Sequence, residues 1–427
     1  MALSIVLSEG IDRNCHPGSV LSGNVQLLAA KQQSLGQVAI TFAGRCKVTI
    51  ERRHSDHVSY YHSKGYYFSQ RQQLHEGDFT FQAGTYIWPF RFVMPSYADP
   101  GLIQSQNGEG DSFKPDPPWR ETGAGELHPL PASFNGPKCC SVEYYLKAEL
   151  TPPRKGSSLF SRTIKDKVML CFWPLMQGPG LDEAFHKHER EFHVRTLKLL
   201  PEDSEERHSV RHRLKGFFQS SSLPELNLHV ELSVPSRVMA TTGTAFPCLV
   251  SVSRCATTVE DTRQVPQSSV QVRRVEFELR SHTRARTRSH QDHKKETTVL
   301  GVGSGAAIEI QKARTADEKG KVESETSQGG TTAKTDLGGL IGARIPPGVT
   351  PDFSTYNIVH FHTLNLKLRL QCAGEEMNFD IKDLPLEVLP QLEIAGQNPP
   401  TWEQLYQDDG ISSQQNSGSH LLPAYVR

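Results

Sequence analysis

The sequence predicts an all-β protein made of two antiparallel β-sandwiches in tandem, because runs of alternating apolar and polar residues occur in both halves of the chain. In the first half this alternation runs through residues 142–150, and in the second half it recurs in residues 226–234 and 364–371. A period of two places each apolar set on one face of a strand, so that one face is buried and the other is solvated. Half-buried strands are typical of antiparallel sheets packed into sandwiches.

Length and charge narrow the possible functions. The 427 residues have room for two to three domains, and 47 Lys and Arg balance 47 Asp and Glu. No global field draws the chain to nucleic acid or to an anionic membrane, so electrostatic recognition must be local. The apolar stretch Ala2–Leu7 is too short for a signal peptide, and no run of 18 apolar residues predicts a spanning helix. The eight cysteines form no CxxC pair, which favours free thiols in a reducing cytosol.

Residues 1–175 form the first expected sandwich. The stretch Ser96–Gly136 is rich in Gly, Pro and Asp and predicts a long loop, which is uncommon in a compact domain. The expected strands of this unit are Ser4–Leu7, Val20–Leu28, Gln37–Glu51, Tyr66–Gln72, Thr85–Met94, Ser141–Thr151 and Ile164–Trp173.

Residues 176–222 are charged and are interpreted as a connector, in which Leu181–Phe192 has the spacing of a short helix. Residues 223–393 form the second expected sandwich, with a flexible insertion at about 315–338, and residues 394–427 form a disordered tail. The expected strands of the second unit are Glu225–Pro235, Phe246–Arg254, Val270–Thr287, Thr297–Gly303, Asn357–Cys372 and Asp383–Leu389.

Several short motifs resemble one family. Pro17–Val25 (PGSVLSGNV) resembles the early strand-turn-strand of arrestin-like proteins, and Leu130–Phe134 (LPASF) followed by Ser141–Ala148 (SVEYYLKA) resembles a signature late in their N-terminal domain. Thr355–Ile358 and Pro385–Pro390 resemble parts of the arrestin C-terminal domain. The charged connector and the insertion are similar to fungal α-arrestins. The resemblance implies two tandem immunoglobulin-like sandwiches of the arrestin fold and a cytosolic adaptor that links membrane cargo to ubiquitin ligases and endocytosis.

The tail carries the sharpest functional motif. Leu422, Pro423 and Tyr425 fit the LPxY variant of the PPxY motif that WW domains bind, because proline favours polyproline II and an aromatic groove takes proline and tyrosine. Upstream, Pro399, Pro400 and Trp402 have the same spacing with Trp in place of Tyr. The expected partner is a WW-containing HECT-type ubiquitin ligase.

A basic strand is the second candidate site. Arg280, Arg284, Arg286 and Arg288 are expected on one exposed face, with His282 between them. Guanidinium groups at this spacing suit phosphates on a receptor or transporter tail, or acidic lipid headgroups. The alternative is the solvated face of an ordinary antiparallel strand. Interleaved aromatic residues are absent, which argues against nucleic acid.

Neither a cofactor, a metal nor a catalytic residue is predicted. The close histidine pairs, among them His360 with His362, lack Cys or carboxylate ligands at zinc-site spacing, and no GxSxG, HExxH, P-loop or kinase motif occurs. The chain is therefore interpreted as a non-enzymatic, cytoplasmic adaptor that is recruited to the plasma membrane or endosomes. One alternative is a ligase-independent trafficking scaffold similar to retromer subunits. The other, a carbohydrate-active sandwich enzyme, would need converging carboxylates.

Overall fold

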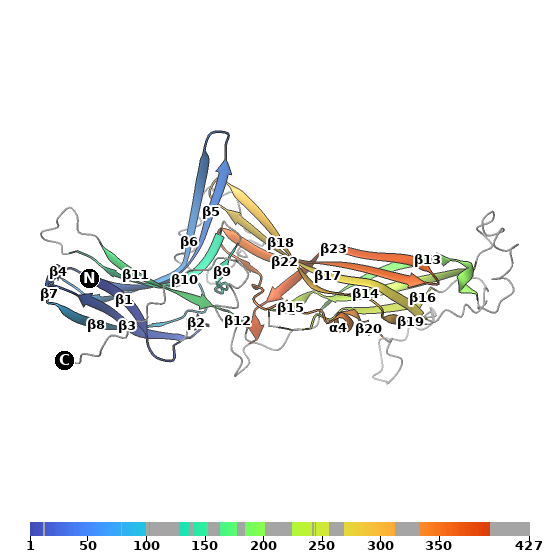
Figure 1. The fold of residues 1–427 in the computed structure, drawn as a ribbon, viewed down its shortest axis with the longest axis horizontal. Coiled ribbons are helices and arrows are strands. Elements are labelled where there is room, and N and C mark those ends of the chain that lie inside the picture. The colour runs from blue at the N-terminus through green and yellow to red at the C-terminus, as the bar shows by residue number, and fades with distance from the viewer. Residues whose placement is uncertain are drawn as a thin grey trace.

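Two β-modules lie end to end in the computed structural model of this chain (Figure 1). The structure describes residues 1–11, 13–77, 79–99, 102, 128–136, 140–152, 163–176, 184–200, 224–240, 243, 245–255, 269–311 and 334–392. Strands predominate in this part of the chain, and the helical elements with described bounds are η1 (Leu197–Leu199) and α4 (Leu337–Ile341). The prediction of an all-β protein with packed sheets is confirmed.

The N-terminal module packs a three-stranded sheet against a six-stranded sheet. In strand order the first sheet consists of β1 (Ala2–Leu7), β3 (Val20–Ala29) and β8 (Gly84–Val93). The second consists of β2 (Asn14–Cys15), β11 (Ile164–Phe172), β10 (Cys140–Leu150), β5 (Val38–Arg53) and β6 (Val58–His75), with β9 (Phe134–Asn135) on β10. A small pair joins β4 (Gln33–Leu35) to β7 (Phe79–Phe81).

The core of this module follows the predicted alternation. The inward residues of β10, namely Val142, Tyr144, Leu146, Ala148 and Leu150, are all buried in one apolar cluster. The Tyr144 hydroxyl donates a hydrogen bond of 2.7 Å to the backbone carbonyl of Pro131, which ties the LPASF segment to the SVEYYLKA strand. A buried tyrosine needs such a partner, so the aromatic ring and its polar tip are both satisfied.

The C-terminal module is built from long antiparallel strands. In strand order it contains β13 (Phe185–Arg195), β14 (Glu225–Pro235), β16 (Leu249–Arg254), β19 (Ala307–Gln311), β17 (Ser269–Arg286), β22 (Ile358–Cys372), β23 (Glu375–Leu389) and β15 (Arg237–Met239). Beside this path, β18 (Gln291–Gly303) pairs with β17, β20 (Thr335–Asp336) with β16, and β21 (Phe353–Ser354) with β22. The alternating leucines Leu364, Leu366, Leu368 and Leu370 are fully buried in its core.

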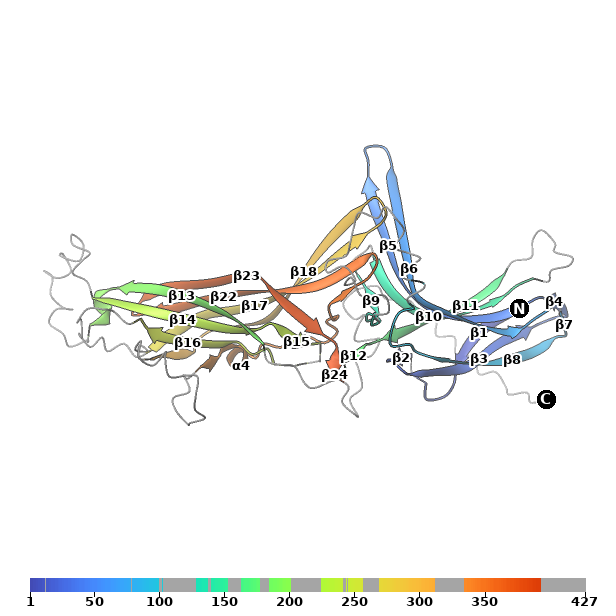
Figure 2. The same cartoon turned by 180° about the vertical axis from the view of Figure 1, so that it is seen from behind.

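Two long hairpins join the modules. The β5–β6 hairpin rises from the N-terminal six-stranded sheet and lies beside the β17–β18 hairpin, as views from both sides show (Figures 1 and 2). The rings of Tyr61 and His290 stack with centroids 3.7 Å apart, and Arg52 donates to the carbonyl of Gln291. Ala285 and Ile358, from β17 and β22, belong to the N-terminal core.

Residues of the N-terminal module also enter the C-terminal core. Ala132 and Trp173, which lie in the first half of the chain, are part of the C-terminal core. In addition, β12 (Leu175–Met176) pairs in parallel with β24 (Gln391–Leu392), so the end of the first module meets the end of the second. Because each core contains residues of the other module, the two sandwiches are packed as one unit rather than joined by the chain alone.

Two sequence expectations are corrected. The helix expected at Leu181–Phe192 is wrong, because the described part of that segment lies in strand β13, which pairs with β14 along eleven residues from Phe185 to Arg195. The segment expected to connect the modules thus contributes an edge strand to the second sheet. The expected flexible insertion at 315–338 ends early, because Thr335 and Asp336 form β20 and Leu337 begins α4. The rest of that insertion lies outside the described residues.

Candidate functional site

The predicted WW-binding residues belong to the C-terminal tail. Leu422, Pro423, Tyr425, Pro399, Pro400 and Trp402 all lie outside the described residues, which end at Leu392. Their role therefore stays a prediction from the sequence.

The basic strand does not form one exposed face. Arg286 is 3% exposed, its guanidinium lies 4.7 Å from the Tyr356 ring centroid, and its Nε donates to the Tyr356 carbonyl at 2.7 Å. Arg284 is exposed and lies over the ring of Phe361, and Arg288 is exposed beyond the end of β17. The expectation of a common exposed face is wrong because this end of β17 enters the junction with the N-terminal module.

Arg280 is held by carboxylates. It contacts Glu278 at 3.4 Å and Asp383 at 3.1 Å, and Lys295 contacts the same Asp383 oxygen at 3.3 Å. Asp383 occupies a left-handed conformation with φ of 51°, and its backbone N–H donates to Asn365 at 2.8 Å. Such a conformation is tolerated by Asp better than by most residues. The turn thereby places the Asp383 carboxylate against Arg280, which the sequence analysis proposed as a phosphate contact.

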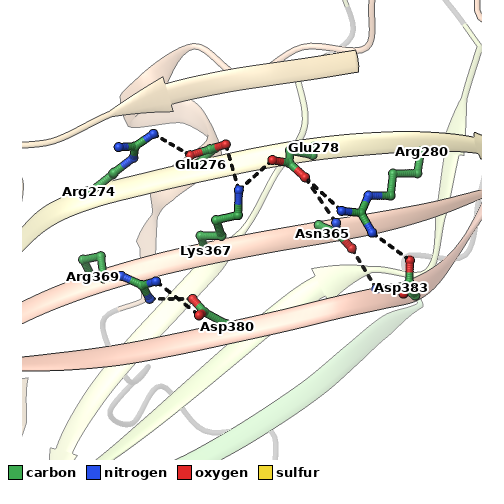
Figure 3. A network of polar contacts seen from close by, with 9 residues as sticks. All are labelled: Arg274, Glu276, Glu278, Arg280, Asn365, Lys367, Arg369, Asp380 and Asp383. Atoms are coloured by element: carbon green, nitrogen blue, oxygen red, sulfur yellow. Dashed lines mark hydrogen bonds and ion pairs between the residues drawn. The ribbon is translucent and has the colours of Figure 1, made fainter. Parts of the chain in front are cut away.

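A charged network continues from Arg280 along the outer face of β17, β22 and β23, as Figure 3 shows. Lys367 bridges Glu276 at 3.1 Å and Glu278 at 2.7 Å, and hydrogen bonds from Lys367 are the main cause that lowers the pKa of Glu278 to about 2. The nine residues drawn include four cations and four carboxylates, so the charges within this drawn network balance. They are Arg274, Glu276, Glu278, Arg280, Asn365, Lys367, Arg369, Asp380 and Asp383.

A second charged network covers the outer face of the N-terminal module, and the sequence reasoning missed it. Glu143 on β10 forms ion pairs with Arg45 at 2.8 Å, Lys47 at 2.7 Å and Lys167 at 3.4 Å. Burial alone would raise the pKa of Glu143, but hydrogen bonds from Lys47 and Arg45 lower it to about 2. The two cations from β5 lie 98 and 96 positions from Glu143 in the sequence, and the third comes from β11, so only the strand register brings them together.

Tyr145 lies at the centre of that network. The Arg45 guanidinium is 4.7 Å and the Lys167 ammonium 4.4 Å from its ring centroid, which are cation–π distances. Burial raises the pKa of Tyr145 to about 12. The alternation of Glu143, Tyr145 and Lys147 was visible in the sequence, yet nothing in it gave the partners on β5 and β11.

Histidines gather where β17, β18 and β22 approach the junction. His360 and His362 do lie on one strand face, as expected, and both are buried. His360 Nδ1 hydrogen-bonds Thr283 at 3.0 Å, and its ring lies 4.8 Å from that of Phe134 in the N-terminal module. Burial holds the pKa of His360 well below its usual value. Among the described residues no group of three or more His, Cys, Asp or Glu is arranged to hold a metal ion.

Part of the chain matches the model of one known protein family. The family model of the arrestin (or S-antigen) N-terminal domain matches residues 7–111, which contain strands from β2 to β8. No curated protein gives a significant match. The match supports an arrestin-like family, and the tandem packed sandwiches are those of an arrestin fold. An arrestin domain indicates, in general, an adaptor or a trafficking scaffold.

Within the part of the chain that the structure describes, no helix is long and apolar enough to cross a membrane.

Proposed function

We propose that the protein is a non-enzymatic adaptor of the fungal α-arrestin type, which links membrane cargo to a WW-containing HECT-type ubiquitin ligase and to endocytic trafficking. The observation that carries this proposal is the interlocked pair of sandwiches. Each core contains residues of the other module, with Ala285 and Ile358 in the first and Trp173 in the second. A rigid body of this kind holds its outer faces at fixed positions, which suits the simultaneous binding of large partners.

The tail supplies the ligase contact in this proposal. In the LPxY motif of Leu422, Pro423 and Tyr425, proline favours polyproline II and tyrosine is the aromatic anchor for a WW groove. The weaker motif at Trp402 lies in the same tail, so two WW domains of one ligase can bind it together. Avidity then raises the apparent affinity above that of either motif.

The test uses the full chain and the isolated tandem WW domains of a HECT-type ligase. The double variant Tyr425→Ala with Trp402→Ala removes both aromatic anchors and is expected to abolish binding in calorimetric titration. Tyr406→Ala is the matched control, because it removes a tail aromatic that lies in neither motif. Equal affinity of the wild type and the double variant would refute the ligase contact and favour a ligase-independent trafficking scaffold.

The cargo contact and the cellular location belong to the same proposal. Membrane receptor or transporter tails are the expected cargo, and the protein is expected in the cytoplasm with recruitment to the plasma membrane or endosomes. Fluorescence imaging of the tagged full chain, before and after cargo internalisation is triggered, tests this. A distribution that never changes would contradict recruitment.

A further inference from the structure

Two serines among the described residues lie three positions after an arginine, and each lies at the tip of a long hairpin. Ser55 follows Arg52 at the tip of the β5–β6 hairpin, and Ser289 follows Arg286 at the tip of the β17–β18 hairpin. An arginine at this position suits a protein kinase with an acidic substrate cleft, because a guanidinium binds carboxylates through paired hydrogen bonds. The sequence alone does not distinguish the two serines.

The tip around Ser55 is exposed. The turn from His54 to His57 is open to solvent at every residue, and it is closed by a hydrogen bond of 2.9 Å from the backbone N–H of His54 to the carbonyl of His57. The Arg53 side chain is 82% exposed, and its ion pair with Glu51 at 2.6 Å is of the surface kind that contributes little to stability. Because little of this tip is buried, a kinase can draw it into an extended conformation at low cost.

Arg52 is within reach of a kinase as well. It is half-buried, and its guanidinium donates to the backbone carbonyl of Gln291 in the neighbouring hairpin, which lies beside it in Figures 1 and 2. A carboxylate offers a guanidinium two parallel hydrogen bonds and an opposite charge, whereas a single carbonyl oxygen offers neither. The contact with Gln291 therefore does not hold Arg52 against a carboxylate of a kinase.

The tip around Ser289 is held by the fold. Arg286 is buried, its Nε donates to the carbonyl of Tyr356 at 2.7 Å, and its backbone N–H donates to the carbonyl of Asn357 at 2.9 Å. The Ser289 hydroxyl hydrogen-bonds Nδ1 of His290 at 2.8 Å. A kinase that bound Ser289 in the same way would have to pull Arg286 out of the junction between the modules, which leaves buried partners without their hydrogen bonds.

We propose that Ser55 is a phosphorylation site for an arginine-directed protein kinase, and that the fold withholds Ser289 from the same enzyme. The phosphoryl donor is ATP. The Ser55 Oγ attacks the γ-phosphorus, and the new Oγ–P bond forms as the bond from that phosphorus to the β,γ-bridging oxygen breaks. ADP leaves with the electron pair of the broken bond, and the hydroxyl proton passes to a carboxylate base of the kinase and then to water.

Phosphorylation changes the charge at the point where the modules touch. The tip of the unmodified β5–β6 hairpin is balanced between two cations and two carboxylates, namely Arg52, Arg53, Glu51 and Asp56. A phosphate on Ser55 adds about −1.5 to −2 charges at pH 7. The added charge lies on the hairpin whose Tyr61 stacks on His290 of the C-terminal module. The tail motifs take no part in this modification, which goes beyond the proposed adaptor function.

The test incubates the full chain with ATP, Mg²⁺ and the catalytic subunit of cyclic-AMP-dependent protein kinase, which serves as the arginine-directed probe. Tandem mass spectrometry of digests gives the initial rate at each serine. Synthetic peptides of residues 49–60 and 283–294 give the rate that each serine has without the fold. After division by the rate of its own peptide, Ser289 is expected to react at least about tenfold more slowly than Ser55, because its arginine is buried.

A pair of variants tests the role of the exposed arginines. Arg52→Ala with Arg53→Ala is expected to slow phosphorylation of Ser55 by about tenfold or more, because two charge-assisted contacts with the kinase are lost. The matched control is Arg284→Ala with Arg288→Ala, which removes two exposed arginines from the β17–β18 hairpin and is expected to leave the rate at Ser55 unchanged. Circular dichroism and urea midpoints check that both variants are folded.

Three results would overturn the proposal. Equal normalised rates at Ser55 and Ser289 would mean that the fold does not select between them. A peptide of residues 49–60 that is phosphorylated, while Ser55 of the full chain is not, would mean that the hairpin tip is closed to a kinase. An equal loss in the two double variants would reduce the effect to overall charge.

Discussion

Protonation of His282 is expected to destabilise the protein between about pH 6.5 and about pH 4. The His282 ring is stacked against Phe361 of β22 and His293 of β18, with centroids 4.8 Å and 5.5 Å apart, and its Nε2 hydrogen-bonds Thr363 at 2.9 Å. Burial is the main cause that lowers the pKa of His282 to about 4, and the charges of Lys295 and His293 add to it, whereas Asp383 opposes it and His362 adds a smaller effect.

The direction of this pH effect follows from the linkage between proton binding and folding. A histidine whose pKa is lower in the folded state binds fewer protons than it does in the unfolded chain, so stability is complete above the unfolded value of about 6.5 and is lost as the pH falls toward 4. A shift from about 6.5 to about 4 corresponds to about 2 kcal/mol of lost stability at about pH 5. Solvent beside the exposed Lys295 screens the interaction, so about 1–2 kcal/mol is expected.

Urea unfolding at about pH 7.5 and about pH 5 measures this loss. His282→Asn removes the titrating ring, and the difference in free energy of unfolding between the two pH values is expected to shrink by about 1–2 kcal/mol. His57→Asn is the control, because His57 is exposed at the tip of the β5–β6 hairpin. The reasoning is refuted if the wild type and His282→Asn lose the same stability on acidification, since His282 would then titrate alike in both states.

Two further outcomes are expected. Leu366→Ala, at a fully buried site in the C-terminal core, should cost about 2–5 kcal/mol in urea unfolding, whereas an effect below about 1 kcal/mol would contradict the packing described for β22. Glu278→Gln should reduce the loss of stability that acidification causes. The lowered pKa of Glu278 contributes stability that is present above the pKa of the unfolded chain and is lost as the pH falls toward about 2. If the melting temperatures of the variant and the wild type fall equally on acidification, the Lys367 contacts do not persist in solution.

The alternation of residues was enough to predict the fold class, because β10, β14 and β22 each bury one face completely. Strand β13 could not be predicted in this way. Its sequence, FHKHEREFHVR, consists mostly of charged residues and histidines, and only Val194 is buried, because β13 is an edge strand that packs little of its surface. Charged side chains are common on edge strands, where they discourage further pairing. Its apolar spacing therefore indicated a helix.

The candidate site was predicted less well, for a physical reason that Arg286 illustrates. Its position on β17 was predicted from the sequence, but its burial depends on the approach of Tyr356. The same holds for Glu143, whose partners lie on two other strands. Local alternation reports which face of a strand a residue occupies, whereas charge balance depends on register and on contacts between modules.

The most direct test of an adaptor is whether one molecule holds both partners at once. Tandem WW domains fixed to a surface are loaded with the full chain, and a fluorescent peptide from a membrane receptor or transporter tail is then added. We expect the peptide to be retained with the wild type, and lost with Tyr425→Ala combined with Trp402→Ala. If the wild type binds WW domains and peptide separately but never together, the two sites exclude each other and the adaptor account is contradicted.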